Sequence, residues 1–207
     1  RSCLVGSEMC IRDRIKCWAQ RLSYVGELGF ELYVKFNYSR KIYELLTHKG
    51  KELNLSNCGM HAMDIMRMES GFLHWGHDIS PEENQYQAGL SFAVSTKKEE
   101  DFIGKKALEK IKKLRIKNRF AMFTLKNSKP GEPLLLHDEP IYLEDKIIGR
   151  STSGNYSFNF KKNLVFGYIT TDFSNEKLKN KGLFIEVEKN KYPIELICKP
   201  LKQTDFK

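Results

Sequence analysis

The chain has 207 residues, of which 41% are hydrophobic and 12% aromatic. This composition excludes an intrinsically disordered chain and predicts a soluble globular protein of one large or two small domains. No apolar stretch approaches the roughly 20 residues that cross a bilayer, and no basic-then-apolar leader opens the sequence. We therefore expect no membrane association and a cytoplasmic location.

The five cysteines contain no Cys-x-x-Cys pair and are odd in number. This pattern favours free thiols over a disulfide framework or a structural zinc site. The cysteines are Cys3, Cys10, Cys17, Cys58 and Cys198.

The formal net charge of +9 raises the question of a nucleic-acid partner. Much of the excess is local, because the stretch from Lys105 to Arg119 holds eight basic residues against the single acid Glu109. Leu108, Ile111 and Leu114 recur there at helical spacing, which predicts an amphipathic helix with a core-facing stripe and a solvated basic face. We therefore expect no nucleic-acid partner, although the same field would suit a small polyanionic ligand.

Residues 1–14 show no clear period and do not fit the pattern that follows. They resemble translated adapter sequence, so we expect a leader that is foreign to the protein and poorly packed.

From Ile15 to about residue 117, strand and helix patterns alternate, which predicts a mixed layer of sheet and helices. The glycine after each helix pattern is a typical stop signal. In chain order we expect a strand over 30–36, a helix capped by Ser39 and closed by Gly50, a helix over 60–70, a polar loop over 74–88, a strand over 90–94 and the basic helix.

After Lys117, short β-like runs follow one another with only turn residues between them. Such spacing predicts a small antiparallel barrel or sandwich. The predicted strands cover 120–125, 141–143, 147–152, 164–170, 184–188 and 192–197. The predicted fold class is therefore α+β, with a mixed sheet-and-helix part over 15–117 and a small antiparallel β-barrel over 118–207.

The segment LSYVGELGFELYV, residues 22–34, is the most informative candidate site. Gly26 and Gly29 suggest a tight connection where the backbone approaches a ligand. Tyr24 could stack on a flat heterocycle, and Glu31 could accept paired hydrogen bonds from an amino-pyrimidine edge. The alternative is an ordinary β-hairpin.

Three further segments hold polar or aromatic candidates. Arg67 and Glu69 stand near a helix end, where they either shape a pocket or are simply solvated. Trp75 and Asp78 lie in the loop HWGHD, whose two histidines lack further metal ligands, so we expect no metal and assign Trp75 to an apolar wall. The segment GRSTSGNYSFNF, residues 149–160, either borders a pocket or forms a barrel turn.

Taken in this order, these segments resemble the aminomethyltransferase superfamily over roughly residues 15–200. LSYVGELGFELYV is similar to the family's Tyr-(Thr/Val)-Gly-Glu-x-Gly-(Phe/Trp)-Glu turn, and MRMESGFLHWGHD to its Leu-Arg-x-Glu segment with the following Gly-x-Asp loop. DFIGKKAL and STSGNYS match its helix start and a segment of its C-terminal barrel.

The resemblance implies transfer of a one-carbon unit from an amine donor to tetrahydrofolate, giving methylenetetrahydrofolate. Met63 stands where aminomethyltransferases carry a folate-binding arginine, and it cannot make that charged contact. The Trp-Gly-His-Asp and Asp-Phe-Ile-Gly forms look more like the sarcosine and dimethylglycine dehydrogenase fusions. In those proteins a separate FAD domain oxidises the N-methyl group.

By residue match, the resemblance implies that Tyr24 and Glu31 contact folate. It makes Arg67, Glu69, Trp75 and Asp78 candidates for shaping the pocket. The family's catalytic carboxylate belongs to a preceding part of the module, so no catalytic residue is assigned and we expect this chain alone to be inactive. The implied partners are folate, a methylated amine donor and an FAD domain upstream.

Two alternatives stay open. One is a stand-alone folate-dependent aminomethyltransferase or demethylase. The other is a non-catalytic folate-binding factor for iron–sulfur cluster assembly, but that branch carries a Lys-Gly-Cys-x-x-Gly-Gln-Glu signature, whereas Cys58 lies in Ser-Asn-Cys-Gly.

Overall fold

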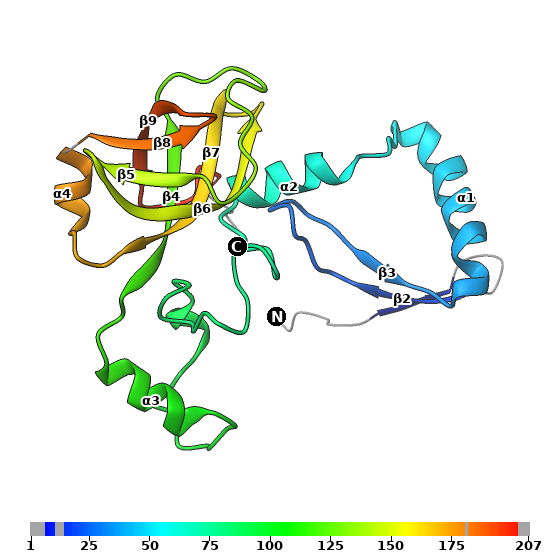
Figure 1. The fold of residues 1–207 in the computed structure, drawn as a ribbon. Coiled ribbons are helices and arrows are strands. Elements are labelled where there is room, and N and C mark those ends of the chain that lie inside the picture. The colour runs from blue at the N-terminus through cyan, green and yellow to red at the C-terminus, as the bar shows by residue number, and fades with distance from the viewer. Residues whose placement is uncertain (1–6, 11–14, 181, 203–207) are drawn as a thin grey trace.

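The computed structural model describes residues 7–10, 15–180 and 182–202. It has the α+β architecture predicted from the sequence, with a sheet-and-helix part followed by a closed antiparallel barrel. In Figure 1 the barrel lies on one side and the N-terminal sheet on the other, helix α2 (Met60–Glu69) lies between them, and helix α3 (Lys105–Lys113) extends below the barrel.

The N-terminal sheet has three antiparallel strands in the order β1 (Ser7–Cys10), β2 (Lys16–Gln20) and β3 (Glu31–Tyr33). The backbone of β1 pairs along β2, with Ser7 opposite Ala19. The backbone of Ser7–Cys10 is thus part of the sheet, and the expectation that residues 1–14 form a foreign, poorly packed leader stays a prediction. The other ten residues of that leader lie outside the described part.

Helix α1 (Ser39–Gly50) lies against this sheet and buries Ile42 with Ile15 and Cys17. The strand predicted over 30–36 is shorter than expected, because the chain enters a 3-10 helix at Phe36–Tyr38. Ser39 does not cap α1. It is the first residue of the helix, and its hydroxyl donates to the carbonyl of Phe36 at 2.7 Å.

Helix α2 (Met60–Glu69) confirms the predicted second helix. Gly71 follows it with a φ of +75°, a conformation that glycine adopts readily. The last turn of α2 packs on the barrel, where Met68 is buried against Leu164 and Phe166. This contact joins the N-terminal part to the barrel.

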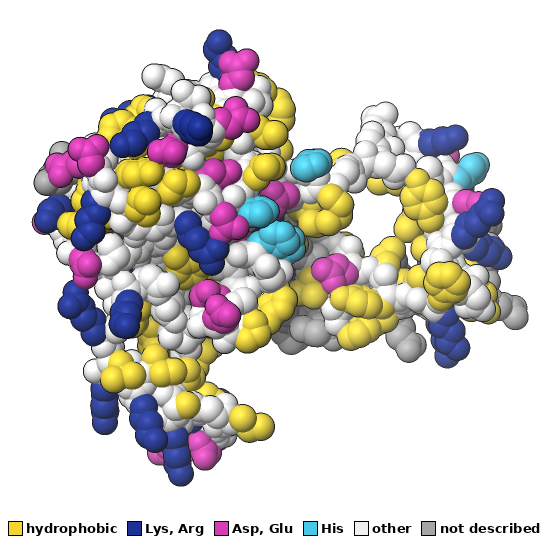
Figure 2. Space-filling model, viewed as in Figure 1, with side chains coloured by type: hydrophobic (Ala, Val, Ile, Leu, Met, Phe, Trp, Pro, Cys, Tyr) yellow, Lys and Arg dark blue, Asp and Glu magenta, His cyan; other side chains and the backbone are white. Residues whose placement is uncertain are grey.

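Two predictions for the segment before the barrel are wrong. The strand expected over 90–94 is a 3-10 turn at Ser91–Ala93, and Phe92 is 86% exposed. Helix α3 (Lys105–Lys113) ends well before Arg119, because Leu114 is extended, and it buries none of its residues. The apolar stripe of α3 therefore does not face the core of this chain, and Figure 2 shows basic side chains gathered over this helix, at the bottom of the view.

The barrel confirms the six predicted strands. Its closed order is β4-β7-β6-β5-β8-β9, and every neighbouring pair is antiparallel. The short helix α4 (Asn175–Asn180) was not expected from the sequence. The strands are β4 (Asn118–Leu125), β5 (Pro140–Leu143), β6 (Lys146–Ser157), β7 (Lys162–Thr170), β8 (Leu183–Val187) and β9 (Asn190–Ile197).

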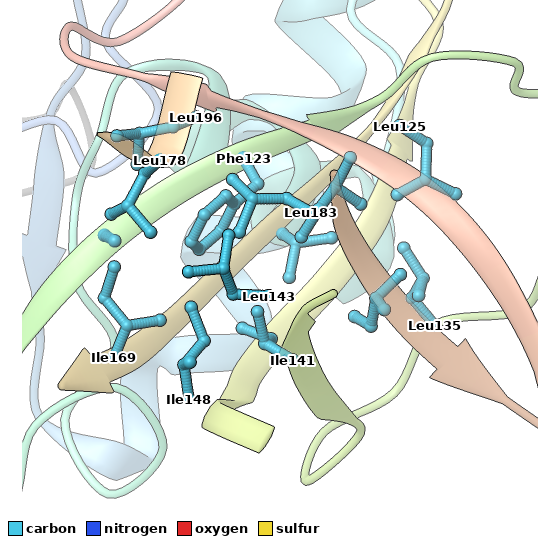
Figure 3. Close-up of a cluster of buried hydrophobic side chains, with 14 residues drawn as sticks. Phe123, Leu125, Leu135, Ile141, Leu143, Ile148, Ile169, Leu178, Leu183 and Leu196 are labelled. Carbon is cyan, nitrogen blue, oxygen red and sulfur yellow. The ribbon is translucent and has the colours of Figure 1, made fainter. Parts of the chain in front are cut away.

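The interior of the barrel is the main hydrophobic core. Its inward side chains come from all of the strands, and Phe123, Ile141, Ile169 and Ile185 are fully buried. Figure 3 shows Phe123, Ile141 and Ile169 pointing toward one another inside the barrel. The short β-like runs that predicted the strands therefore supply the side chains of this core.

Candidate functional site

The turn between β2 and β3 places Tyr24 against the segment that follows α2. The Tyr24 hydroxyl donates to the carbonyl of Leu73 at 2.7 Å. Its ring stacks on Phe72 with 6.2 Å between centroids and 17° between planes. Gly26 supports the tight turn with a φ of +65°. Tyr24 is therefore anchored by both its ring and its hydroxyl.

Burial raises the pKa of Tyr24, with smaller opposing and reinforcing effects from Arg67, Asp78 and Asp64. The phenol is consequently neutral and a hydrogen-bond donor near neutral pH. Phe72 links Tyr24 to a group of charged side chains, because its carbonyl accepts a hydrogen bond from Arg67.

Glu31 lies at the exposed start of β3, in a different group of contacts. Its Oε2 accepts a hydrogen bond of 2.5 Å from the Tyr33 hydroxyl, and the Tyr33 ring lies 5.3 Å from that of Trp18. The structure thus places Tyr24 and Glu31 on the same turn-and-strand segment but with separate hydrogen-bond partners.

Arg67 is the centre of the charged group and is only 1% exposed. Its Nη1 donates to Asp78 at 2.5 Å and to the carbonyl of Phe72 at 3.1 Å. Its Nε donates to Asp64 at 2.8 Å, and its Nη2 to the Ser153 hydroxyl at 2.7 Å. The guanidinium therefore connects α2, the following loop and strand β6.

Asp78 completes this buried ion pair. Its Oδ1 accepts from the hydroxyls of Thr152 at 2.5 Å and Ser153 at 2.8 Å. Its Oδ2 accepts from the His74 amide at 2.9 Å in addition to Arg67. A buried ion pair is tolerated when further hydrogen bonds satisfy both partners, as they do here.

Glu69 forms a second buried contact between α2 and the barrel. Its carboxylate accepts from the Ser157 hydroxyl at 2.6 Å and the Asn159 amide at 2.9 Å. The sequence alternative of a solvated helix end is wrong for Arg67 and Glu69, because both side chains are buried against β6 and its following turn.

Trp75 and the two histidines lie at the surface of the loop that carries Asp78. Trp75 is 65% exposed, so it lies apart from the buried Arg67 group. The rings of His74 and His77 stack at 4.5 Å. Among the residues that the structure describes, no three His, Cys, Asp or Glu side chains are grouped to hold a metal ion.

Two grooves lie outside the Tyr24 turn. A groove of about 320 Å³ is bordered by Asp78 and Thr152 together with His77, Glu83 and Arg150. A larger one of about 930 Å³ opens at one end of the barrel, where lysines predominate among its charged residues. Neither groove is lined by Tyr24 or Glu31. Of the predicted site residues, the structure therefore joins Arg67 with Asp78, brings Tyr24 close to both, and leaves Glu31 and Trp75 apart.

The polar partners on the barrel and on α2 were not predicted from the sequence. Asp64 had no expected role, and Gly149–Phe160 was expected only to border a pocket or to form a turn. The available signal was the run of hydroxyl and amide side chains in that segment, which is unusual for a strand facing apolar neighbours. The partners missed are Asp64, Thr152, Ser153, Ser157 and Asn159.

Two family models match the chain and together cover most of it. The GCVT N-terminal domain matches residues 6–98, and the glycine cleavage T-protein C-terminal barrel domain matches residues 118–202. The chain belongs to the glycine cleavage T-protein family.

The relatives include a dehydrogenase and an aminomethyltransferase. The chain is 36% identical to human mitochondrial dimethylglycine dehydrogenase, over 93% of its own length and 22% of that protein. It is 33% identical to an aminomethyltransferase of Alkaliphilus metalliredigens, over 94% of its length and 51% of that protein. The chain thus spans about half of one relative and about a fifth of the other.

A solved structure has the same fold. The glycine cleavage system aminomethyltransferase T from Bartonella henselae superposes with a TM-score of 0.77 at 24% identity, over 95% of this chain and 52% of that one. Within the part of this family member that the structure describes, no helix is long and apolar enough to span a bilayer.

Proposed function

We propose that this chain is the tetrahydrofolate-binding part of a one-carbon transferase module. In this proposal an N-methyl amine, oxidised by a partner FAD domain as in sarcosine and dimethylglycine dehydrogenase fusions, supplies the carbon for methylenetetrahydrofolate. We assign the folate-binding part to residues 15–117 and the barrel to residues 118–207.

The observation that carries the proposal is the match of residues 6–98 and 118–202 to the two family domains, together with the Tyr24–Glu31 segment, whose Glu31 side is exposed. Support for the dehydrogenase branch comes from the 36% identity to human dimethylglycine dehydrogenase. Met63, which occupies the position of the family's folate-binding arginine, also separates this chain from typical aminomethyltransferases.

The chemistry of the two side chains suits folate. Glu31 is an exposed carboxylate whose Tyr33 bond uses Oε2, which leaves Oε1 to accept hydrogen bonds from an amino-pyrimidine edge. Tyr24 offers a partly exposed aromatic ring and a neutral phenol. In this proposal the ligand contacts both side chains, which have separate protein partners.

Tetrahydrofolate would bring the carbon-accepting nitrogens, and this chain would hold and orient the ring system. The catalytic carboxylate, in this proposal, comes from the preceding part of the module. We therefore expect the 207-residue chain to bind tetrahydrofolate weakly and to turn over no substrate.

The test is calorimetric titration of tetrahydrofolate into this chain and into a longer chain that includes the upstream-encoded part of the module. We expect the longer chain to bind more tightly, and Glu31→Ala to weaken its binding about tenfold or more, as loss of a charged hydrogen-bond acceptor does. Lys35→Ala, a nearby exposed change, is the control and should bind as the parent does. Equal binding by the parent and Glu31→Ala would count against the proposal.

The second candidate is a stand-alone folate-dependent aminomethyltransferase. It is favoured by the 33% identity to the Alkaliphilus metalliredigens enzyme over 94% of this chain. The upstream coding sequence separates the two, because a Gly-x-Gly-x-x-Gly unit between a strand and a helix there indicates a dinucleotide cofactor.

A further inference from the structure

Tyr24 depends on a short support, the Phe72–Leu73 segment just after α2. Its ring stacks on Phe72, and its hydroxyl donates to the carbonyl of Leu73 at 2.7 Å. The position of Tyr24 therefore follows the position of these two residues. A residue that holds Phe72 and Leu73 in place therefore also holds the Tyr24 ring, which we assign to folate binding.

Arg67 holds that support from the buried side. Its Nη1 donates to the carbonyl of Phe72 at 3.1 Å, and the same nitrogen donates to Asp78 at 2.5 Å. Because the guanidinium is planar and its donors are fixed in direction, these two bonds set the orientation of the whole group.

The barrel supplies the other anchor of Arg67. Its Nη2 donates to the Ser153 hydroxyl on β6 at 2.7 Å, and its guanidinium carbon lies 5.4 Å from the centroid of the Phe166 ring on β7. Arg67 is 1% exposed, so water does not compete for these contacts. A continuous chain of contacts thus runs from the barrel through Arg67 to Phe72 and Tyr24.

We infer that Arg67 is a positioning residue for folate binding: by fixing the Phe72–Leu73 segment against the barrel, it sets the position of Tyr24 and hence the affinity for the pterin or aminobenzoyl ring. This inference rests on the proposed function. It gives Arg67 no direct contact with the ligand, and it makes strand β6 part of the apparatus that orients the N-terminal turn.

The structure offers a matched control at the same junction. Glu69 joins the same helix to the barrel through Ser157 and Asn159, and those bonds do not reach the Phe72–Leu73 segment. Ser157→Ala therefore removes a buried hydrogen bond between α2 and the barrel without loosening the support of Tyr24.

The test variants are Arg67→Lys, Ser153→Ala and Tyr24→Phe, with Ser157→Ala as the control, in the full chain extended upstream. Lysine keeps the charge but lacks the fork that reaches Phe72, Asp78 and Ser153 together. Ser153→Ala removes one anchor of the guanidinium and serves as the milder change if Arg67→Lys folds poorly. Tyr24→Phe removes the bond to Leu73 and keeps the ring.

The first readout needs no folate. NMR of the protein with carbon-13-labelled tyrosine, with the Tyr24 ring signal assigned from Tyr24→Phe, reports how the ring sits on Phe72. We expect Arg67→Lys, and to a smaller extent Ser153→Ala, to shift this signal, while Ser157→Ala leaves it in place. An unmoved Tyr24 signal in both Arg67→Lys and Ser153→Ala overturns the inference, whether or not folate binds.

The second readout is tetrahydrofolate affinity by calorimetry. We expect Arg67→Lys to weaken binding about tenfold and Ser157→Ala less than about twofold, and the effects of Arg67→Lys and Tyr24→Phe to be less than additive, because both act through one ring. Strictly additive effects overturn the inference. If Arg67→Lys shifts the Tyr24 signal but the parent chain binds no tetrahydrofolate, the proposed function is overturned and the inference about Arg67 is not.

Discussion

Asp78 accepts four hydrogen bonds while its carboxylate is wholly buried beside Arg67. Taking both charges out of water is costly, so the ion pair is sustained by its hydroxyl and amide partners rather than by attraction alone. The group is therefore sensitive to loss of either charge. Removal of the Asp78 carboxylate should therefore lower the free energy of unfolding substantially.

We expect Asp78→Ala to lower the free energy of unfolding by about 3–5 kcal/mol, because it leaves Arg67 charged, buried and without that partner. Urea unfolding followed by circular dichroism measures this difference. Glu44→Ala, which breaks the exposed Arg40–Glu44 pair on α1, should cost no more than about 0.5 kcal/mol. Similar losses for the two variants would contradict the role given to Asp78.

Single residues were only partly predictable from the sequence. Arg67 and Asp78 were both chosen as candidates, but their pairing was not, because eleven positions and a loop separate them. Their shared partner Ser153 lies a further 75 positions along the chain from Asp78. Such contacts depend on how α2 docks on β6, which local pattern does not encode. The roles of Tyr24 and Glu31 in folate binding stay predictions.

Among the elements, the turn after α2 has a steric requirement for glycine. Gly71 has a φ of +75°, and a Cβ atom built there would lie 2.5 Å from Cγ of Pro200. A side chain at this position meets both backbone strain and a collision. The turn therefore requires glycine at position 71 for two reasons, its backbone conformation and the nearness of Pro200 in the segment that follows β9.

We expect Gly71→Ala to lower the free energy of unfolding by about 2 kcal/mol, through the strained φ and the displacement of Pro200. The control is Gly59→Ser at the start of α2, where Gly59 has an extended backbone, no side-chain cap and nothing within 4 Å of an added Cβ. Serine is a good N-cap, so this change should be neutral or stabilise by a few tenths of a kcal/mol. Thermal unfolding measures the melting temperatures of both variants. Equal melting temperatures for Gly71→Ala and Gly59→Ser would contradict the steric requirement at Gly71.

Elements with a strong period and a packed partner were predictable, and elements without a partner were not. Each of the six barrel strands contributes side chains to the buried core. Leu90, Phe92 and Val94 alternate with Ser91 and Ala93, yet none of the described strands pairs with them, and Phe92 is exposed. Period alone therefore indicated a strand where backbone pairing was missing.

At the scale of the whole molecule, the hydrophobic core is unequally divided. Among the side chains that the structure describes, the barrel encloses fourteen buried hydrophobic residues, whereas the cluster beneath α1 contains three. Several large apolar side chains of the N-terminal part are exposed, as the yellow side chains over it in Figure 2 show. They include Trp18, Phe36 and Tyr43.

We expect hydrogen exchange to follow this division. Amide protons of β4 and β7 should be protected longest, and those of β2 and β3 should exchange faster, because opening the small cluster exposes less apolar surface. Mass-spectrometric exchange on this chain, read peptide by peptide, gives the comparison. Equal protection of β2 and β7 would show that the two parts open together.

The segment after β9 returns to the N-terminal part and joins it at three points. The Lys202 amide donates to the carbonyl of Glu69 at 2.8 Å, the Lys202 ammonium pairs with Glu27, and Pro200 rests on Gly71. The polypeptide therefore spans the junction twice, once through α2 and once through this returning strap. A single crossing would act as a hinge, whereas two crossings act as a brace that resists rotation of the Tyr24 turn about the helix axis.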